Sequence, residues 1–328
     1  MKLFVTGATG FIGRVVVEAA VTRGHDVVAL TRAPSTDSPA SAGRGSEQRV
    51  VGDVRRPEEW MHGLEGCDAV LHLAIVHGSP VDQWDVLVHG THQLVAAMLR
   101  RGVRRLVLVS SMSVYDYAAL DAGAMVDEST PLEPAPEGRD DYTRAKLAQE
   151  AVVTTAPGLQ TSVLRLGAVY GVDRLWNAGL ALRLPGGPGF DIGSGGSMKL
   201  TYVENAGLAI VLASERGEAV GTVVNVVDDD LPSPARFADA LRRHGLDAPR
   251  AVPVPYAVVS GLARCASGLN RRLLRGRVHL PEIAVPARLG ARFKPLRYSN
   301  RAARQVLGWA PPFDLDQALA RIADRSVR

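Results

Sequence analysis

The sequence predicts an α/β fold in which a doubly wound parallel sheet is joined to a smaller, mostly helical C-terminal lobe. Three observations lead to this prediction. Short apolar runs alternate with helix-period segments, a glycine-rich turn follows the first run, and the pattern changes after residue 171. Continuous apolar strands alternating with helices indicate a parallel sheet covered on both faces, because each right-handed crossover buries its apolar stripe on the sheet.

Six strand-like runs define the expected sheet, at residues 3–6, 27–31, 49–52, 69–73, 106–110 and 162–165. This arrangement is of the Rossmann type. The Gly/Pro-rich stretch 184–197 should be a long loop bordering a ligand. A helix followed by a strand at 222–226 should return to the sheet. The residues from 228 on are expected to be helical and are basic. We therefore expect a nucleotide-binding domain of residues 1–172 plus 201–227, and a substrate-binding lobe of residues 173–200 plus 228–328.

Composition is that of an ordinary globular protein. Of 328 residues, 46% are hydrophobic and 22% charged, and the two cysteines, Cys67 and Cys265, cannot form a disulfide framework. We find no signal-peptide pattern and expect a cytoplasmic protein. Residues 228–328 hold 18 Lys+Arg against 9 Asp+Glu. An acidic substrate, a membrane surface or a solvated face would each explain this excess.

A glycine-rich turn joins the first strand to a helix, with Gly7, Gly10 and Gly13 spaced three apart. Gly7 permits the tight turn, Gly10 lets the backbone approach a pyrophosphate, and Gly13 allows close packing of helix on strand. A diphosphate would then lie at the positive end of the helix. Predicted cofactor contacts in this turn are Gly7, Thr9, Gly10, Phe11, Ile12 and Gly13.

The end of the second strand distinguishes the two nicotinamide cofactors, because an acid there binds ribose hydroxyls and a cation binds a 2′-phosphate. The strand ends in Arg32, so we predict NADP and keep NAD as the alternative. After the third strand, Asp53 should accept a bond from the adenine amino group, next to Val54. Leu73 and Ala74 should let the chain pass close to the dinucleotide.

A tyrosine and a lysine lie one helical turn apart, at Tyr142 and Lys146, on the same face of a predicted helix. A phenol has a reference pKa of about 10, and a nearby ammonium group favours the phenolate. Tyr142 can then exchange a proton with a carbonyl or hydroxyl near neutral pH. Ser111 ends the fifth strand, where its hydroxyl can hold the carbonyl oxygen.

With these residues in place, the chain resembles the extended short-chain dehydrogenase/reductases, also called the NAD-dependent epimerase/dehydratase family. The resemblance spans nearly the whole length and rests on residues 6–13, 71–74, 110–115, 142–146, 165–171 and 307–309. It implies that Ser111, rather than Ser110 or Ser113, is the catalytic serine. It also implies that Lys146 binds the nicotinamide ribose.

Two positions depart from the family pattern. Leu87 stands where the family usually has an asparagine that helps to hold a proton-relay water. Met198 stands where nucleotide-sugar members typically have an arginine. The first departure puts the relay in doubt, and the second weakens a nucleotide-sugar function.

The leading hypothesis is an NADP-dependent ketoreductase or secondary alcohol dehydrogenase for a small hydrophobic molecule, similar to the dihydroflavonol reductase and 3β-hydroxysteroid dehydrogenase members. Tyr142 would be its general acid/base. A nucleotide-sugar epimerase or dehydratase is the first alternative, and a non-catalytic NAD(P)-binding sensor the second. The epimerase alternative draws on five arginines that would meet a diphosphate: Arg264, Arg271, Arg272, Arg275 and Arg277.

Residues 255–277 also form an amphipathic helical pattern, with Val258, Leu262, Leu269 and Leu273 among its apolar positions. We expect it to form part of the substrate-pocket wall, and an interfacial membrane helix is the alternative. The remaining expected wall is the loop after Val76, residues 112–117 and residues 175–189. We expect no metal site, no nucleic-acid partner and no membrane association, and leave a homodimer open.

Overall fold

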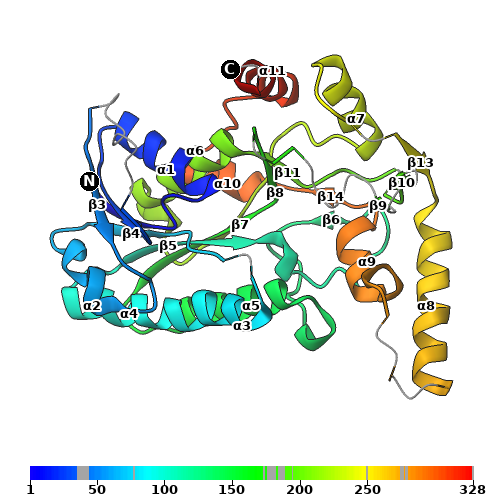
Figure 1. Cartoon of the computed structure of the whole chain (residues 1–328), viewed down its shortest axis with the longest axis horizontal. Helices are drawn as coiled ribbons and strands as arrows, with labels where there is room; N and C mark the ends of the chain where they lie inside the picture. Colours follow the sequence, from blue (N-terminus) through cyan, green and yellow to red (C-terminus); the bar gives the residue numbers. More distant parts are fainter. Residues whose placement is uncertain are drawn as a thin grey trace.

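The protein is described by a computed structural model (Figure 1). It describes residues 1–34, 44–76, 78–172, 174–175, 182–183, 189–193, 195–248, 250–273, 277 and 280–326.

A seven-stranded sheet with every neighbouring pair parallel forms the centre of the molecule, in the order β12-β7-β5-β4-β1-β2-β3. The chain winds outward from β1 in both directions, which confirms the predicted doubly wound topology. The strands are β1 (Lys2–Thr6), β2 (Asp26–Thr31), β3 (Glu47–Val51), β4 (Ala69–His72), β5 (Arg105–Ser111), β7 (Gln160–Leu166) and β12 (Val223–Val226).

Helices cover both faces of this sheet (Figure 1). One face carries α1 (Phe11–Thr22), α6 (Val203–Glu215) and α10 (Arg301–Leu307), and the other carries α2 (Pro57–Trp60), α3 (Pro80–Trp84), α4 (Gly90–Arg101) and α5 (Asp141–Thr154). In β1, Leu3 and Val5 are buried in the first core, which lies between the sheet and helices α1 and α6. Phe4 between them is buried in the second core, which lies between the sheet and helices α4 and α5. Because alternate residues of one strand are buried on opposite faces, the strand has to be apolar throughout.

Helices predominate after β12: α7 (Pro234–Arg243), α8 (Tyr256–Leu273), α9 (Pro286–Phe293) and α11 (Leu315–Ser326). Two sheets of two strands each lie outside the central one, and the second of them joins this region to the rest. β8 (Ala168–Tyr170) pairs with β11 (Leu200–Tyr202), and β6 (Met125–Val126) pairs with β14 (Arg297–Tyr298). The indole of Trp309 is buried in the first core and donates a hydrogen bond of 3.1 Å to the carbonyl of Asn205 on α6.

The loop predicted at residues 184–197 is wrong in part. Residues 184–188 and 194 lie outside the described ranges, but Gly189–Asp191 form strand β10. β10 lies between β9 (Leu182–Arg183) and β13 (Ala251–Pro253). The β13 partner is about sixty positions away in sequence, so no local pattern announces the pairing.

Candidate active site

A large cavity of about 1070 Å³ runs along the carboxyl ends of the sheet strands. Segments that follow β1, β2, β3 and β4 line it, together with the ends of β5 and β7 and the start of α5. In doubly wound sheets this edge, where the strand order reverses, is where ligands bind. All of the predicted site residues line this one cavity: Gly7, Thr9, Gly10, Phe11, Ile12, Gly13, Arg32, Asp53, Val54, Leu73, Ala74, Ser111, Tyr142 and Lys146.

The turn between β1 and α1 requires glycine at two points. Gly7 has φ +69°, and a Cβ placed on it would lie 2.8 Å from the backbone nitrogen of Ala74. A Cβ on Gly13 would lie 2.0 Å from the carbonyl oxygen of Gly7. Gly10 begins α1 without a side-chain cap, so the N–H groups of the first turn are left to a ligand. This cradle fits the diphosphate of a dinucleotide.

Charged side chains line the far end of the cavity. Arg32 is exposed after β2. The carboxylate of Asp53 accepts two bonds from Arg55, of 2.9 and 2.6 Å, and Arg55 also pairs with Asp85 at 2.6 Å. The adenine contact predicted for Asp53 therefore competes with Arg55, which lies two residues away and was not among the predicted site residues.

Ser111, Tyr142 and Lys146 meet where β5 ends and α5 begins. The carboxylate of Asp140 caps α5 by accepting from the backbone nitrogen of Thr143 at 2.9 Å, which fixes the first turn that carries Tyr142. The Lys146 ammonium lies 6.0 Å from the centre of the Tyr142 ring. It is buried, and it donates to the carbonyl oxygen of Val109 at 2.8 Å.

Burial dominates the acidity of this pair. It raises the pKa of Tyr142 to about 12, while a hydrogen bond with Ser111 acts in the opposite direction. Burial also lowers the pKa of Lys146 to about 8, opposed by the charge of Glu150. The expected depression of the tyrosine pKa by Lys146 is not found in the protein alone: burial of the phenol raises its pKa, and the group that lowers it is Ser111.

A buried hydrogen-bond network lies behind the lysine. Lys146 donates to the side-chain oxygen of Gln149 at 2.8 Å, and the amide nitrogen of Gln149 donates to the hydroxyl of Thr91 at 2.9 Å. His72 joins the Thr91 hydroxyl at 2.8 Å and the Thr6 hydroxyl at 2.7 Å. Burial, assisted by the Lys146 charge, lowers the pKa of His72 to about 3, so the imidazole is neutral.

The Leu87 side chain packs in an apolar cluster with Val88 and Ala145 beside this network. Leu87 is fully buried, and its backbone carbonyl accepts from the hydroxyl of Thr91 at 2.5 Å. Gln149 provides the polar contact behind Lys146. Gln149 and His72 were not among the predicted site residues, although Gln149 lies three positions from Lys146 on the same helix face.

A buried ion pair fixes the framework next to Ser111. Arg165 donates to both carboxylate oxygens of Glu150, at 3.0 and 2.7 Å, and the hydroxyl of Ser110 donates to the same carboxylate. β5, α5 and β7 are thereby joined at one point. Ser110 is directed into this pair, while Ser111 interacts with Tyr142.

A second cavity, of about 250 Å³, adjoins the first, and Ala168 lines both. Ser113 and Thr143 line the second cavity, one or two positions from Ser111 and Tyr142 in the first. Five cationic side chains reach it, together with two carboxylates: Arg139, Lys199, Arg288, Arg292 and Lys294, with Asp140 and Glu282.

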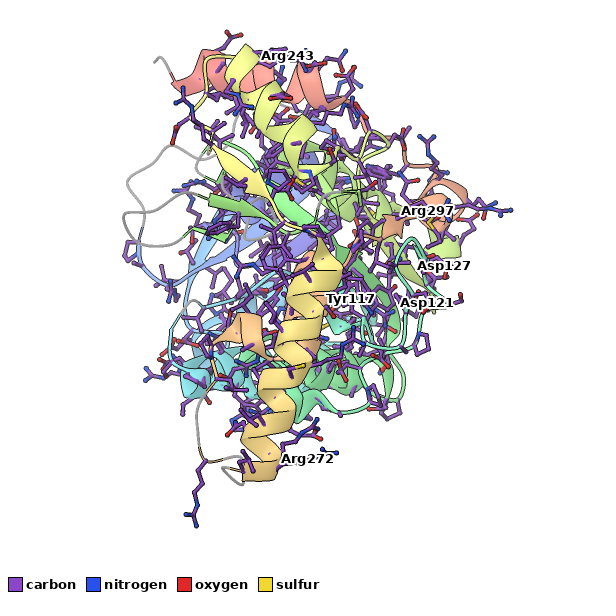
Figure 2. All side chains as sticks on the ribbon, turned by 90° about the vertical axis from the view of Figure 1, so that its right-hand side faces the viewer. Tyr117, Asp121, Asp127, Arg243, Arg272 and Arg297 are labelled. Carbon is purple, nitrogen blue, oxygen red and sulfur yellow. The ribbon has the colours of Figure 1, made fainter. Side chains whose placement is uncertain are left out.

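The prediction that the apolar side of residues 255–277 lines the pocket is wrong for four of its residues. Val258, Leu262, Leu269 and Leu273 are exposed on the outer side of α8, which lies on the surface facing the viewer in Figure 2. Helix α9 lines the second cavity instead. Periodicity identifies an amphipathic helix but not which of its faces packs on the protein.

The arginines predicted to meet a diphosphate are also placed elsewhere. Arg264, Arg271, Arg272 and Arg277 are exposed and line neither cavity, and Arg275 lies outside the described ranges. In the described part of the chain, His, Cys, Asp and Glu side chains form no cluster of three that could hold a metal ion. None of the helices described has the length and apolar character needed to cross a bilayer.

Comparison with known proteins gives consistent matches. Residues 3–226 match the sequence profile of the NAD dependent epimerase/dehydratase family. A 2-alkyl-3-oxoalkanoate reductase from Stenotrophomonas maltophilia is 27% identical, with 100% of each chain covered. A 4-hydroxy-2-methyl-3-oxo-4-farnesyl-3,4-dihydroquinoline-1-oxide ketoreductase from Stigmatella aurantiaca is 28% identical over 94% of this chain and 92% of its own. A short-chain dehydrogenase/reductase superfamily protein from Agrobacterium tumefaciens with bound NAD shares the fold, with TM-score 0.69 and 22% identity over 100% and 98% of the two chains.

Proposed function

The chain belongs to the NAD-dependent epimerase/dehydratase family and is an NAD(P)-dependent enzyme of the short-chain dehydrogenase/reductase type, and we propose that it is an NADP-dependent ketoreductase. The observation that carries the proposal is the convergence of Ser111, Tyr142 and Lys146 on the cavity that also contains the glycine cradle. A ketone bound there would lie beside a hydroxyl donor, a phenolic acid and a dinucleotide.

The three side chains have separate tasks in this proposal. A bound nicotinamide supplies the hydride. The Ser111 hydroxyl donates a hydrogen bond to the ketone oxygen, and the Tyr142 phenol transfers its proton to that oxygen. Lys146 binds the ribose and keeps a positive charge beside the phenol, so that the phenolate formed is stabilised. Gln149 and the carbonyl of Val109 hold its ammonium in place.

NADP is the proposed cofactor because of Arg32. This side chain lines the cavity just beyond β2, where an acidic residue would bind the ribose hydroxyls of NAD. A guanidinium there suits a 2′-phosphate. Arg55 lies in the same cavity, but Asp53 and Asp85 already compensate its charge.

The relatives support a reductase over an epimerase. Two proteins that match most of the chain are named as a reductase of an oxoalkanoate and a ketoreductase. Of the arginines that favoured a nucleotide-sugar substrate, Arg264, Arg271 and Arg272 are exposed on α8, Arg277 is exposed beyond its end, and Arg275 lies outside the described ranges. That alternative thus loses its main support.

The direct test is consumption of NADPH by the purified protein with a panel of ketones, including 3-oxo acids and their esters. Tyr142→Phe should lower turnover by about 10²–10⁴-fold, the usual contribution of a positioned acid. Tyr256→Phe, on α8 and outside both cavities, is the matched control. Wild-type rates in Tyr142→Phe, or turnover without net NADPH consumption, would contradict the proposal.

A further inference from the structure

We propose that the second cavity binds a carboxylate of the substrate, with Lys199 and Arg288 as its cationic contacts. The assignment rests on the proposed reduction of a ketone in the first cavity. The substrate would then be an oxo acid rather than a purely hydrophobic molecule, with its ketone in the first cavity and its carboxylate in the second.

The two cavities share a wall at the reacting end. Tyr142 lines the first and its neighbour Thr143 lines the second, while Ala168 borders both. The backbone nitrogen of Ser113, in the second cavity, donates to the Ser111 hydroxyl at 3.1 Å. A molecule whose ketone lies at Ser111 and Tyr142 therefore has its next few atoms at the mouth of the second cavity.

Not all of the five cations there are available to a ligand. Arg139 is paired with Glu133 at 3.0 Å and donates to the carbonyl oxygens of Tyr115 and Ser113. Lys294 donates to the carbonyl oxygens of Tyr117 and Leu120, at 2.5 and 2.6 Å. These two side chains hold the surrounding loops.

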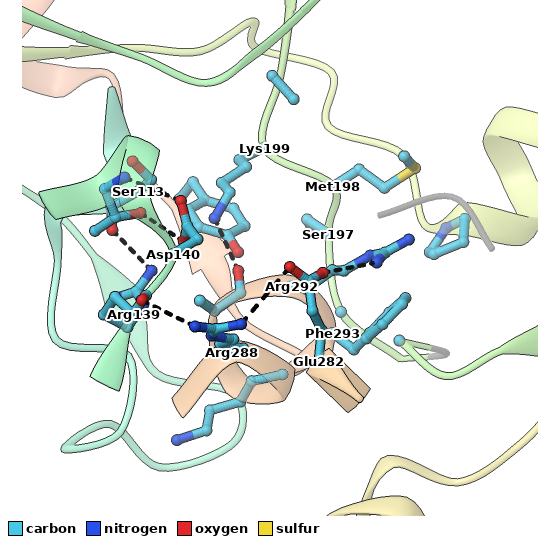
Figure 3. A pocket seen from close by; sticks show the side chains of 18 residues that line it. Ser113, Arg139, Asp140, Ser197, Met198, Lys199, Glu282, Arg288, Arg292 and Phe293 are labelled. Carbon is cyan, nitrogen blue, oxygen red and sulfur yellow. Dashed lines mark hydrogen bonds and ion pairs between the residues drawn. The ribbon is translucent and has the colours of Figure 1, made fainter. Parts of the chain in front are cut away.

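Lys199 is differently placed. Its ammonium donates to the hydroxyl of Tyr117 at 3.0 Å and to the carbonyl of Ala291 at 3.1 Å, and lies 4.2 Å from the centre of the Tyr117 ring. Across the described residues it forms no ion pair with a carboxylate. An ammonium group has three protons to donate, so one remains after these two bonds. Figure 3 shows the side chain reaching toward α9 from the segment before β11.

Arg288 lines the same cavity from α9 (Figure 3). One of its terminal nitrogens donates to the carbonyl of Arg139 at 3.2 Å, and the other lies 3.9 Å from Glu282, beyond hydrogen-bond range. Its buried Nε has no partner in the described structure. Glu282 is itself 63% exposed, so it neutralises this guanidinium weakly.

The size and remaining lining of the cavity indicate which anion it takes. Its volume of about 250 Å³ is below the range of roughly 300–1,000 Å³ usual for a whole ligand, so it suits one part of a ligand. Ala168, Met198, Ala291 and Phe293 provide apolar contacts beside the cations. A carboxylate on a short aliphatic chain fits this combination better than a nucleoside diphosphate does.

Protonation of Lys199 should couple to binding. Burial, together with the charge of Arg139 and opposed by that of Asp140, lowers its pKa to about 7. The other groups facing it are Tyr117 and Tyr298, whose own pKa values are raised by burial. Affinity for a carboxylate should therefore decrease as the pH rises through about 7, since the ammonium loses its proton.

The test is calorimetric titration of the NADP⁺-loaded enzyme with hexanoate, with hexanamide as a neutral ligand of the same shape and with UDP. Lys199→Met and Arg288→Met should each weaken hexanoate by about 10- to 150-fold, the effect of one charge-assisted hydrogen bond. The control Arg272→Met, at the exposed end of α8 (Figure 2), should bind like wild type. Thermal unfolding identifies any variant that fails to fold. If one of the two variants does not fold, hexanoate binding by the other still tests the proposal.

Equal binding of hexanamide and hexanoate, no hexanoate binding by wild type, or binding indifferent to both substitutions would overturn the carboxylate site. Binding of UDP that depends on Lys199 would overturn it too, and would favour a diphosphate substrate. If hexanoate binds as expected while neither 3-oxohexanoate nor any other ketone consumes NADPH, the carboxylate site stands and the proposed ketoreductase function fails.

Discussion

The ammonium of Lys146 lies 2.8 Å from the side-chain oxygen of Gln149, one turn further along the same helix. Through Gln149 the lysine is connected to Thr91, His72 and Thr6, and so to the strand that precedes the glycine cradle. Two parts of the site that are far apart in sequence are thereby fixed relative to one another.

Gln149→Leu should reduce kcat by about 10-fold or more and leave KM for the ketone nearly unchanged. A hydrogen bond to a charged group contributes roughly 1.5–3 kcal/mol, and without it the ammonium loses its position. Gln149→Glu should instead raise the pKa of Lys146 from about 8 and shift the alkaline limb of the pH–rate profile upward. Gln93→Leu, on the exposed side of α4, is the control. An unshifted profile in Gln149→Glu would exclude a positioning role.

Arg32→Ala should raise the Kd for NADPH by about 10- to 150-fold and leave that for NADH unchanged, because only NADPH carries the 2′-phosphate. Fluorescence titration of the purified protein measures both values. Arg100→Ala, at the exposed end of α4, should change neither. Tighter NADH binding by the wild type would show that NAD is the cofactor.

His72 should make the protein less stable in acid. Its pKa is 6.5 in the unfolded chain and about 3 in the fold, so between these values the unfolded state binds more protons. The contribution of neutral His72 to the free energy of unfolding is complete above pH 6.5. It decreases by about 1.4 kcal/mol for each unit by which the pH is lowered from there toward about 3. Urea unfolding at several pH values should show the stability difference between wild type and His72→Asn shrinking at this rate. A constant difference for His72→Asn would mean that the imidazole is charged in the fold.

Gly13→Ala should abolish most dinucleotide binding and destabilise the fold by roughly 1–3 kcal/mol, the usual cost of overpacking. The added methyl would overlap the carbonyl oxygen of Gly7, which is backbone and cannot move aside. Gly268→Ala, with open space around it in α8, is the matched control and should be neutral or stabilising. Measurements of unfolding midpoint and NADPH affinity distinguish the two effects. Unchanged affinity in Gly13→Ala would mean that the turn does not hold the cofactor.

The main sheet and the cavity that carries the predicted residues could be predicted because their signals are local. Each core strand is a continuous apolar run, and Gly7, Tyr142 and Lys146 belong to short motifs with fixed spacing. The carboxyl ends of parallel strands meet at one edge, so the strand order alone brings these motifs together.

What could not be predicted depends on contacts between distant segments. β10 needs β13, and Gln149 acts only because His72 and Thr91 lie behind it. Lys199 and Arg288 are 89 positions apart and line one cavity, which no pattern in either segment predicts. The outward orientation of α8 is likewise set by the surface against which it packs.

Ala168 borders both cavities, and this shared wall bears on regioselectivity. If the acid end of a substrate is held at Lys199, the number of carbons between the acid and the ketone decides which carbonyl reaches Tyr142. In a chain with several ketones, the enzyme would then reduce one position and leave the others. A larger side chain at residue 168 would alter which position that is.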